Sequence, residues 1–273
     1  MDWVKAKNYT IIVLVILNIV LLGLNIYKSF DTRLSYSRIN SLNALLKDDN
    51  ITLSSKLPRS YKPMAEINAS EYSFDHIKLQ KIFFAGQNNV KRTEEYNSVI
   101  FMSDTSRLSL KGSSINYTTT LSYSINNEEK AKEYAAQLVN DINNEFGKFK
   151  FYSISSANDE YIIKYYENRE GYNIFSNFIY FTIKGNNASI ALNYVKLGSV
   201  IDTKNNIYAA DEALYSAVKS IKKEEEKPVI TDVKLGYYAM KVNSAGEVVA
   251  VPFYLINASN KVYYVNAYTG ECF

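Results

Sequence analysis

An uncharged apolar stretch near the N-terminus constrains this chain more than any other feature of its sequence. Residues 9–27, YTIIVLVILNIVLLGLNIY, are 19 residues without a charged side chain, and most of them are Ile, Leu or Val. A helix of this length, rising about 1.5 Å per residue, just crosses a hydrocarbon core of about 30 Å. A buried helix of a soluble protein is rarely apolar on all sides. The stretch therefore predicts a transmembrane helix at residues 9–27, preceded by a tail at residues 1–8.

A cleaved signal peptide is the main alternative to an anchor. The apolar stretch is longer than the roughly 7–15 residues of a signal-peptide core, and no small-residue cleavage site follows it. Basic residues flank it almost equally, with Lys5 and Lys7 before it and Lys28 and Arg33 after it. The usual excess of basic residues on the cytoplasmic side therefore gives almost no information on orientation. The short tail favours a single-pass protein of the cell membrane. We expect its N-terminus in the cytoplasm and the domain after Lys28 outside the cell.

The apolar stretch also carries two amide side chains. Asn18 lies at its midpoint and Asn25 follows seven residues later, so both share one helix face with Ile11, Val15 and Leu22. An amide inside a membrane is expected to turn towards another helix and form a hydrogen bond there. The sequence therefore predicts these five residues as a partner-binding transmembrane face. The alternative is that Asn18 is merely tolerated and Asn25 reaches the membrane surface.

The remaining composition disfavours catalysis. Cys272 and His76 are the single cysteine and the single histidine of the chain, so disulfides, Cys–His metal sites and histidine-based triads lack their components. We find no catalytic or phosphate-binding motif. Charge after residue 28 is nearly balanced, which argues against a nucleic-acid partner. We therefore expect no enzyme activity, no catalytic residue, no cofactor and no metal. The pairs Tyr165-Tyr166 and Tyr263-Tyr264 fit a peptide or glycan groove, but one buried ring and one exposed cross-strand ring in each pair is the simpler interpretation.

Periodicity after the apolar stretch indicates an α+β fold. A helix at residues 30–47 is expected to continue from the membrane as a stalk, with a linker to residue 58. Apolar stripes predict helices at residues 126–146, ending at Gly147, and at residues 208–221. Strands are expected at residues 79–84, 98–102, 107–111, 115–125, 149–155, 160–166, 177–183, 189–196, 229–242, 248–256 and 261–267.

This order predicts antiparallel sheets with packed helices, because each helix follows a run of strands instead of alternating with single ones. It also allows two related β-α-β units. We place the first unit at residues 59–147, where residues 59–72 form a loop or an edge strand, and the second at residues 148–273.

Both ends of the sequence resemble known families. Met1-Asp2-Trp3, two lysines, the apolar stretch and Leu57-Pro58 resemble the start of the YycI (WalI) family. Residues 208–214, YAADEAL, and 263–271, YYVNAYTGE, look like the helix and closing strand of a PepSY-type unit. Val251-Pro252-Phe253 departs from the Pro-Trp that relatives carry at this place.

The YycI resemblance implies a membrane-anchored, non-enzymatic regulator of signal transduction at the cell envelope of Gram-positive bacteria. Its expected partners are a WalK-like (YycG) sensor histidine kinase of a two-component system and a YycH-like protein. The PepSY resemblance leaves an alternative open: an anchored extracellular binding or inhibitory module that acts on an envelope protease, because such units accompany protease pro-regions.

Overall fold

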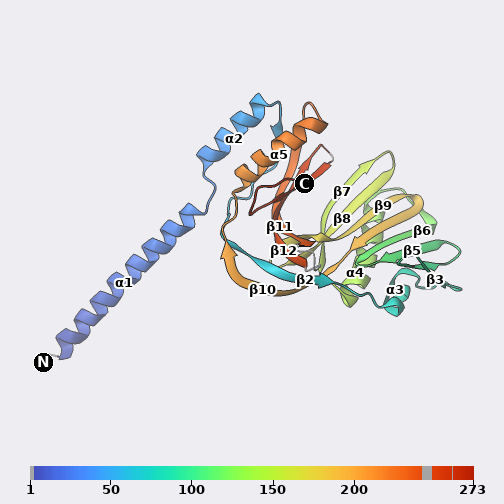
Figure 1. The fold of residues 1–273 in the computed structure, drawn as a ribbon, viewed down its shortest axis with the longest axis horizontal. Coiled ribbons are helices and arrows are strands. Elements are labelled where there is room, and N and C mark those ends of the chain that lie inside the picture. Colours follow the sequence, from blue (N-terminus) through green and yellow to red (C-terminus); the bar gives the residue numbers. More distant parts are fainter. Residues whose placement is uncertain (1–2, 242–247, 260) are drawn as a thin grey trace. The chain divides into compact units, whose positions relative to one another are not determined.

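The structure, a computed structural model, describes residues 3–241, 248–259 and 261–273, and the side chains of these except residues 4–6, 24–31 and 241. The described residues form five helices and 13 strands (Figure 1). The helices are α1 (Trp3–Asp31), α2 (Tyr36–Asp48), α3 (His76–Phe83), α4 (Glu128–Glu145) and α5 (Ala210–Glu224).

The strands are mostly short and antiparallel. They are β1 (Thr52–Leu53), β2 (Met64–Glu71), β3 (Lys91–Glu95), β4 (Ser98–Met102), β5 (Ser106–Lys111), β6 (Ser114–Ile125), β7 (Phe149–Ala157), β8 (Glu160–Arg169), β9 (Tyr172–Asn193), β10 (Val195–Asn205), β11 (Val229–Lys241), β12 (Val248–Ala258) and β13 (Lys261–Asn266). The predicted α+β class is confirmed. Two strand pairs, β1 with β11 and β11 with β9, are parallel, which the prediction of antiparallel sheets did not contain. Such pairs need a long connection, and α5 lies in the one that leads to β11.

The chain divides into two compact units, each built from separate segments. The first unit contains Met1–Met64, Asn205–Lys234 and Ile256–Phe273, and the second contains Ala65–Lys204 and Leu235–Leu255. The predicted boundary between residues 147 and 148 lies inside the second unit. Residues 28–58, predicted as a stalk and linker, belong to the first unit together with the C-terminal residues.

The second unit is organised around the long strand β9. Its first half pairs with β8 and its second half with β6, and the order of neighbours continues through β5, β4 and β3 (Figure 1). The break between the strands predicted at residues 177–183 and 189–196 is wrong, because β9 passes through the turn-forming residues 185–187 between them. Gly185 has a positive φ of 59° at an irregularity in the pairing with β6, so the turn-forming residues produce a bulge inside a strand.

Two helices pack in the second unit beside this sheet. Asn127 caps α4 by accepting a hydrogen bond from the backbone N–H of Lys130, and Gly147 has a positive φ just after the helix. The predicted apolar stripe of α4 is confirmed in the core by the buried residues Ala131, Ala135, Val139 and Ile142. The predicted strand at residues 79–84 is wrong: α3 spans His76–Phe83, and Leu79 and Phe83, one helical turn apart, are buried.

The first unit joins α2 and α5 with short strand pairings. Ser35 caps α2, Leu42 and Leu46 are buried, and residues 32–35 separate α2 from α1. The predicted continuous stalk helix is therefore wrong, because α2 is a separate helix with a buried face. The predicted loop or edge strand at residues 59–72 is also corrected: β2, which belongs to the second unit from Ala65 on, has β12 and β10 as neighbours on its two sides.

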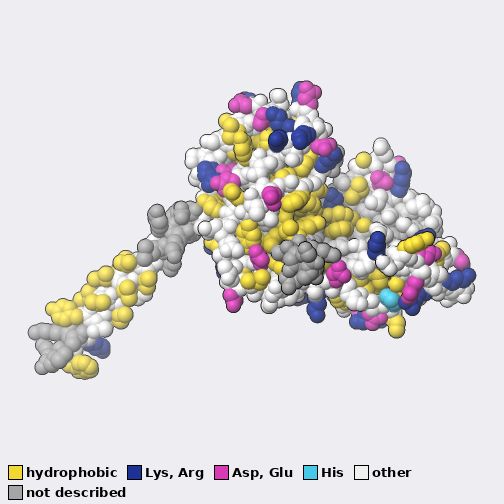
Figure 2. All heavy atoms as spheres, viewed as in Figure 1, with side chains coloured by type: hydrophobic (Ala, Val, Ile, Leu, Met, Phe, Trp, Pro, Cys, Tyr) yellow, Lys and Arg dark blue, Asp and Glu magenta, His cyan; other side chains and the backbone are white. Residues whose placement is uncertain are grey.

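Helix α1 includes the predicted transmembrane stretch, residues 9–27. Its large apolar side chains from Tyr9 to Leu22 are between 48% and 68% exposed, and Figure 2 shows hydrophobic side chains along this helix. Over the part of the chain that the structure describes, no helix meets the length and hydropathy expected of a membrane span. The transmembrane helix is thus not confirmed and stays a prediction.

Candidate functional site

The predicted partner-binding face lies on α1. Ile11, Val15, Asn18 and Leu22 are exposed there. Asn25 lies in the same helix, but its side chain is outside the described residues. The described part of the chain does not cover these side chains, and exposed apolar surface of this extent usually marks an interaction site. The proposed role of the five residues remains a prediction, because no partner helix is present to test it.

A second candidate site is a groove between α2 and α5 in the first unit. Helix α5 begins with Asp211 and Glu212, where carboxylates are favoured by the helix dipole, and Glu212 accepts a hydrogen bond from the backbone N–H of Ala209 (2.9 Å). Its apolar stripe, which includes Ala213, Leu214 and Ala217, is buried. Packing of this stripe leaves the acidic start of the helix facing α2.

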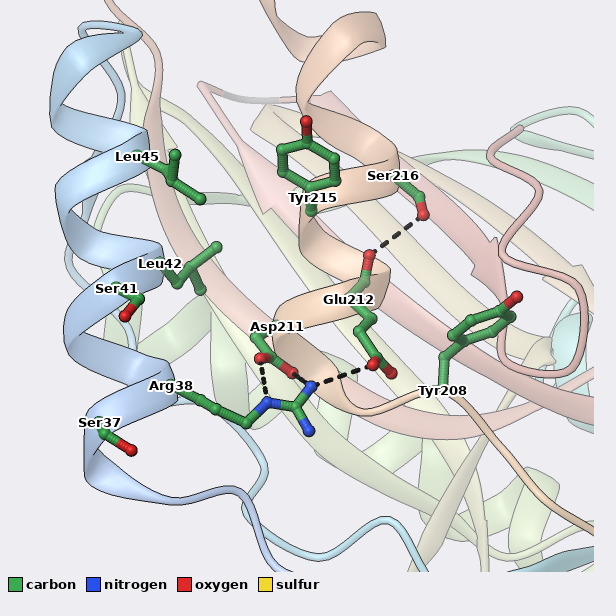
Figure 3. Close-up of a pocket in the computed structure, with 10 residues that line it drawn as sticks. All are labelled: Ser37, Arg38, Ser41, Leu42, Leu45, Tyr208, Asp211, Glu212, Tyr215 and Ser216. Carbon is green, nitrogen blue, oxygen red and sulfur yellow. Dashed lines mark hydrogen bonds and ion pairs between the residues drawn. The ribbon is translucent and has the colours of Figure 1, made fainter.

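Arg38 of α2 joins the two helices (Figure 3). Its Nε and Nη2 donate hydrogen bonds to the two carboxylate oxygens of Asp211, both at 2.7 Å, and Nη2 lies 3.1 Å from a carboxylate oxygen of Glu212. The Asp211 side chain is 12% exposed and that of Arg38 is 37% exposed. This bidentate geometry is the strong form of an ion pair.

The charges around Arg38 keep it protonated. Burial by itself lowers the pKa of Arg38, but the hydrogen bond and charge of Asp211, with the charge of Glu212, outweigh burial and raise it above its ordinary value. One guanidinium against two carboxylates leaves a net negative charge at this end of the groove. A second ion pair, between Lys222 and Asp49, joins the other ends of α2 and α5.

The groove encloses about 520 Å³ and is amphipathic. Figure 3 shows the ion cluster near the start of α5, with Leu42 and Leu45 further along α2. The remaining lining residues are hydroxyl-bearing: Ser37, Ser41, Tyr208, Tyr215 and Ser216. A volume and lining of this kind accommodate side chains of a partner protein or a small ligand. The lining contains no histidine, cysteine or lysine that could act as a base or nucleophile.

The structure gives ordinary roles to the other residues that the sequence singled out. Asp75 is the N-cap of α3, because its carboxylate accepts hydrogen bonds from the backbone N–H groups of Ile77 and Lys78, and His76 follows it as the first helical residue. Burial raises the pKa of the Cys272 thiol, although a hydrogen bond with Ser220 opposes this, so the reactive thiolate is disfavoured. In the described residues, no cluster of acidic, histidine or cysteine side chains could hold a metal ion.

The tyrosine pairs do not form a groove on one strand face. Tyr165 and Tyr166 are both buried, at 6% and 1% exposure, so the expected pattern of one buried and one exposed ring is wrong for this pair. Strand β8 is covered on both sides at this point. Tyr263 is buried and Tyr264 is half-buried on β13, which is closer to the expected alternation.

Sequence reasoning missed the Arg38 cluster. Asp211 and Glu212 were noticed only as part of a PepSY-like helix, and Arg38 fell in the predicted stalk. The two ends of the ion pair are 173 residues apart, and no local pattern links them. The only available signal was the acidic start of α5.

The described residues combine an exposed apolar helix with a sheet-rich α+β fold that carries an amphipathic, ion-paired groove. The model of the YycI protein family matches residues 31–268, so the chain belongs to the YycI family. This confirms the expected family, whereas residues 1–30, which carry most of the resemblance, lie outside the matched range. The family is regulatory and non-catalytic, and it supports a role in the WalK (YycG) two-component system at the level of the family.

One solved structure has a similar fold, and a second shows a weaker likeness. An uncharacterised protein from Eubacterium rectale is 13% identical, with a TM-score of 0.52 over 82% of this chain and 91% of its own. The C-terminal domain of YpeB from Bacillus megaterium is 10% identical, with a TM-score of 0.39 over 74% of this chain and 96% of its own. The first likeness shows the fold alone, and the second is too low to support a conclusion. No curated protein matches the chain.

Proposed function

We propose that this protein is a membrane-anchored, non-enzymatic regulator of a WalK-like sensor histidine kinase and that it acts together with a YycH-like protein. The observation that carries the proposal is the family match over residues 31–268, directly after the exposed apolar part of α1. Family membership supports the regulatory role, and the apolar helix supports a site within a membrane.

In this proposal α1 crosses the cell membrane once, with the N-terminus in the cytoplasm and the two units outside the cell. The apolar side chains of α1 then lie in lipid or against other helices. A polar amide at mid-membrane favours the second, because contact with another helix gives Asn18 a hydrogen-bond partner that lipid lacks. The face with Ile11, Val15 and Leu22 would contact the kinase.

In this proposal, regulation depends on a difference in how tightly the protein binds two conformations of the kinase. A bound helix shifts the equilibrium between two kinase conformations only if it binds one of them more tightly than the other. Interhelical hydrogen bonds of this kind contribute about 0.6 kcal/mol on average and up to about 1.7 kcal/mol. Contacts made by α1 therefore bias the kinase, and contacts made by the groove between α2 and α5 with a YycH-like protein add to this bias.

Cysteine crosslinking in cells tests the proposal. Cys272 is the only native thiol, so a Cys272→Ser background leaves each introduced cysteine as the single reactive group. Cysteines replacing Ile11, Val15 and Leu22 should crosslink to a sensor kinase identified by mass spectrometry. Cysteines replacing Val13, Ile16 and Val20 are the matched controls, because 100° per residue places them on the opposite face.

The pattern of crosslinks decides between the outcomes. Strong crosslinks at the first three positions and weak ones at the controls support docking through the Asn18 face, and Asn18→Leu should then weaken the crosslinks about 3- to 18-fold, the equivalent of 0.6–1.7 kcal/mol. Crosslinks without helical periodicity, or strongest at the control positions, would show that the face is wrong. Recovery of an envelope protease in place of a kinase would replace the proposal with that of an inhibitory module.

A further inference from the structure

A cavity of about 250 Å³ in the second unit has a role in none of the functions discussed above. It lies between α3 with the turn after it, strand β6 and helix α4. Its lining mixes aromatic rings with polar groups, including Phe83, Tyr117, Thr119 and Tyr134. It is smaller than the pockets that hold drug-sized molecules, so its volume fits one small ring.

The inner wall of the cavity is held rigidly by buried hydrogen bonds. The hydroxyl of Tyr117, a residue 4% exposed, donates to the backbone carbonyl of Phe83 at 2.7 Å. The hydroxyls of Thr119 and Ser106 are 2.8 Å apart, and Gln87 Nε2 donates to Ser106 at 2.9 Å. A wall fixed in this way needs no rearrangement when a ligand binds.

The outer wall is different, because its polar groups lie at the protein surface. Tyr134, Gln137 and Asp141 occupy positions i, i+3 and i+7 of α4 and so share one helix face. None of their side chains forms a hydrogen bond or an ion pair with the residues that the structure describes. Tyr134 is half-buried, whereas Gln137 and Asp141 are exposed, and among the described residues no buried polar side-chain atom lacks a hydrogen-bond partner, so these three groups reach solvent at the mouth of the cavity.

Tyr134 is available as a hydrogen-bond donor throughout the physiological range. Burial, with smaller contributions from Tyr117 and Tyr123, raises the pKa of Tyr134 above its ordinary value, so its hydroxyl stays protonated. Its ring packs edge-on against Phe181, which fixes the direction of the hydroxyl. Asp141 accepts hydrogen bonds and Gln137 both donates and accepts.

The charge of the lining restricts the ligand class. Asp141 is the only charged side chain of the lining, and no lysine or arginine is present to pair with a phosphate or a carboxylate. Aromatic rings pack against the C–H faces of a sugar ring, whereas amide, hydroxyl and carboxylate groups bind its hydroxyls. An anionic ligand would face Asp141 without compensation.

We propose that this cavity is a binding site for a single uncharged sugar ring, either free or at the end of a glycan. The rings of Phe83 and Tyr117 form its apolar wall, and Tyr134, Gln137 and Asp141 bind the hydroxyls. The site lies in a different part of the fold from the groove between α2 and α5. If the protein is the regulator proposed above, a sugar bound here would act on it at a site separate from those for its protein partners.

Saturation-transfer NMR on the full chain tests this site. The protein is prepared in a zwitterionic detergent without a sugar headgroup, and glucose, N-acetylglucosamine and glucose 6-phosphate are titrated separately. We expect transfer to at least one uncharged sugar at millimolar concentration, the affinity of a small ligand with few contacts. Glucose 6-phosphate should bind at least about 10-fold more weakly than glucose, because its phosphate meets Asp141.

Single-atom changes locate the binding. Tyr134→Phe keeps the ring packing and should weaken sugar binding about 3- to 10-fold, the equivalent of one hydrogen bond. Tyr96→Phe makes the same change at a 99% exposed tyrosine of the same unit and should leave binding unaltered. Absence of transfer to both uncharged sugars overturns the proposal, and so does equal binding by wild type and Tyr134→Phe when both show the same unfolding midpoint.

Discussion

The core of the second unit consists largely of aromatic rings and β-branched side chains, whereas α5 of the first unit buries several small ones. Phe181, Tyr165 and Tyr134 are in ring contact in the second unit. Ala210, Ala213 and Ala217 are fully buried on α5. Large rings remove much apolar surface from water, and each alanine removes little. In the first unit, ion pairs between α2 and α5 add to the small apolar contribution of these alanines.

One part of the second unit also differs from the first unit in how close its contacting residues are in the sequence. Strands β3 to β6 of the second unit pair with their immediate neighbours in the chain. In the first unit, β1 pairs with β11 and α2 contacts α5. The second unit also contains distant pairs, because β2 pairs with β12 and β9 pairs with β11. Local pairing costs little loop-closure entropy, and distant pairing costs more. Distant contacts are therefore expected to depend on specific interactions, such as that of Arg38 with Asp211 in the first unit.

Truncation of a ring should produce the largest effect. Phe181 is fully buried, and Phe181→Ala should lower the free energy of unfolding by about 3–5 kcal/mol through lost burial and a cavity. Urea unfolding of the full chain in detergent measures this, and hydrogen exchange should show the loss of protection in β8 and β9. The comparator is Val218→Ala on α5, which should cost about 1.6 kcal/mol from two lost carbons. Equal costs would contradict the distinction between the two cores.

The local part of the fold could be predicted from the sequence. On β6, alternation predicts one face with Ile115, Tyr117, Thr119, Leu121, Tyr123 and Ile125. All of these are buried except Leu121, which is half-buried, and Tyr123, which is exposed. The apolar stripe of α4 and its end near Gly147 were also predicted correctly. These features depend on residues within a few positions of one another, where side-chain period and capping determine the structure.

The rest depends on contacts that no local pattern contains. The short apolar segment at residues 79–84 has no period that distinguishes strand from helix, and the cap Asp75 was the neglected signal for α3. Turn-forming residues 185–187 lie inside β9 because pairing with β6 outweighs their local preference. The groove between α2 and α5 joins two segments whose contact is visible only in three dimensions.

Removing the ion pair should affect the first unit by an intermediate amount. Arg38→Met leaves Asp211, which is 12% exposed, without its bidentate partner. Because Arg38 itself is 37% exposed and solvent screens part of the charge, we expect a loss of about 1–2 kcal/mol. Hydrogen exchange should show faster opening of α2.

Lys222→Met is the matched control for this change. Lys222 and Asp49 are 46% and 38% exposed, so their ion pair should contribute at most about 1 kcal/mol. Faster exchange in α2 for Lys222→Met than for Arg38→Met would show that burial of Asp211 does not determine the strength of the contact.

The smallest effect concerns Glu167, a half-buried acid in the second unit. Burial raises the pKa of Glu167 above its ordinary value, although a hydrogen bond from Asn177 (2.5 Å) and the charges of Arg169 and Lys148 oppose this. The folded protein therefore binds the proton more tightly than the unfolded chain. Between the unfolded pKa of about 4.3 and the raised folded pKa, the contribution of Glu167 to stability decreases as the pH rises.

Glu167→Gln should remove this decrease, because the amide keeps an acceptor for Asn177 and does not ionise. As the pH rises through this window, the urea midpoint of the variant should increase relative to that of wild type. Above the window, the difference between the two midpoints should stay constant. Glu95→Gln, at an exposed position of β3, serves as the control and should not show this gain. A variant that instead loses stability relative to wild type as the pH rises would mean that the ionised carboxylate of Glu167, held by Asn177 and Arg169, stabilises the fold. In that case the second unit would depend on a paired charge just as the first unit does, and the contrast between them would rest on their side-chain sizes alone.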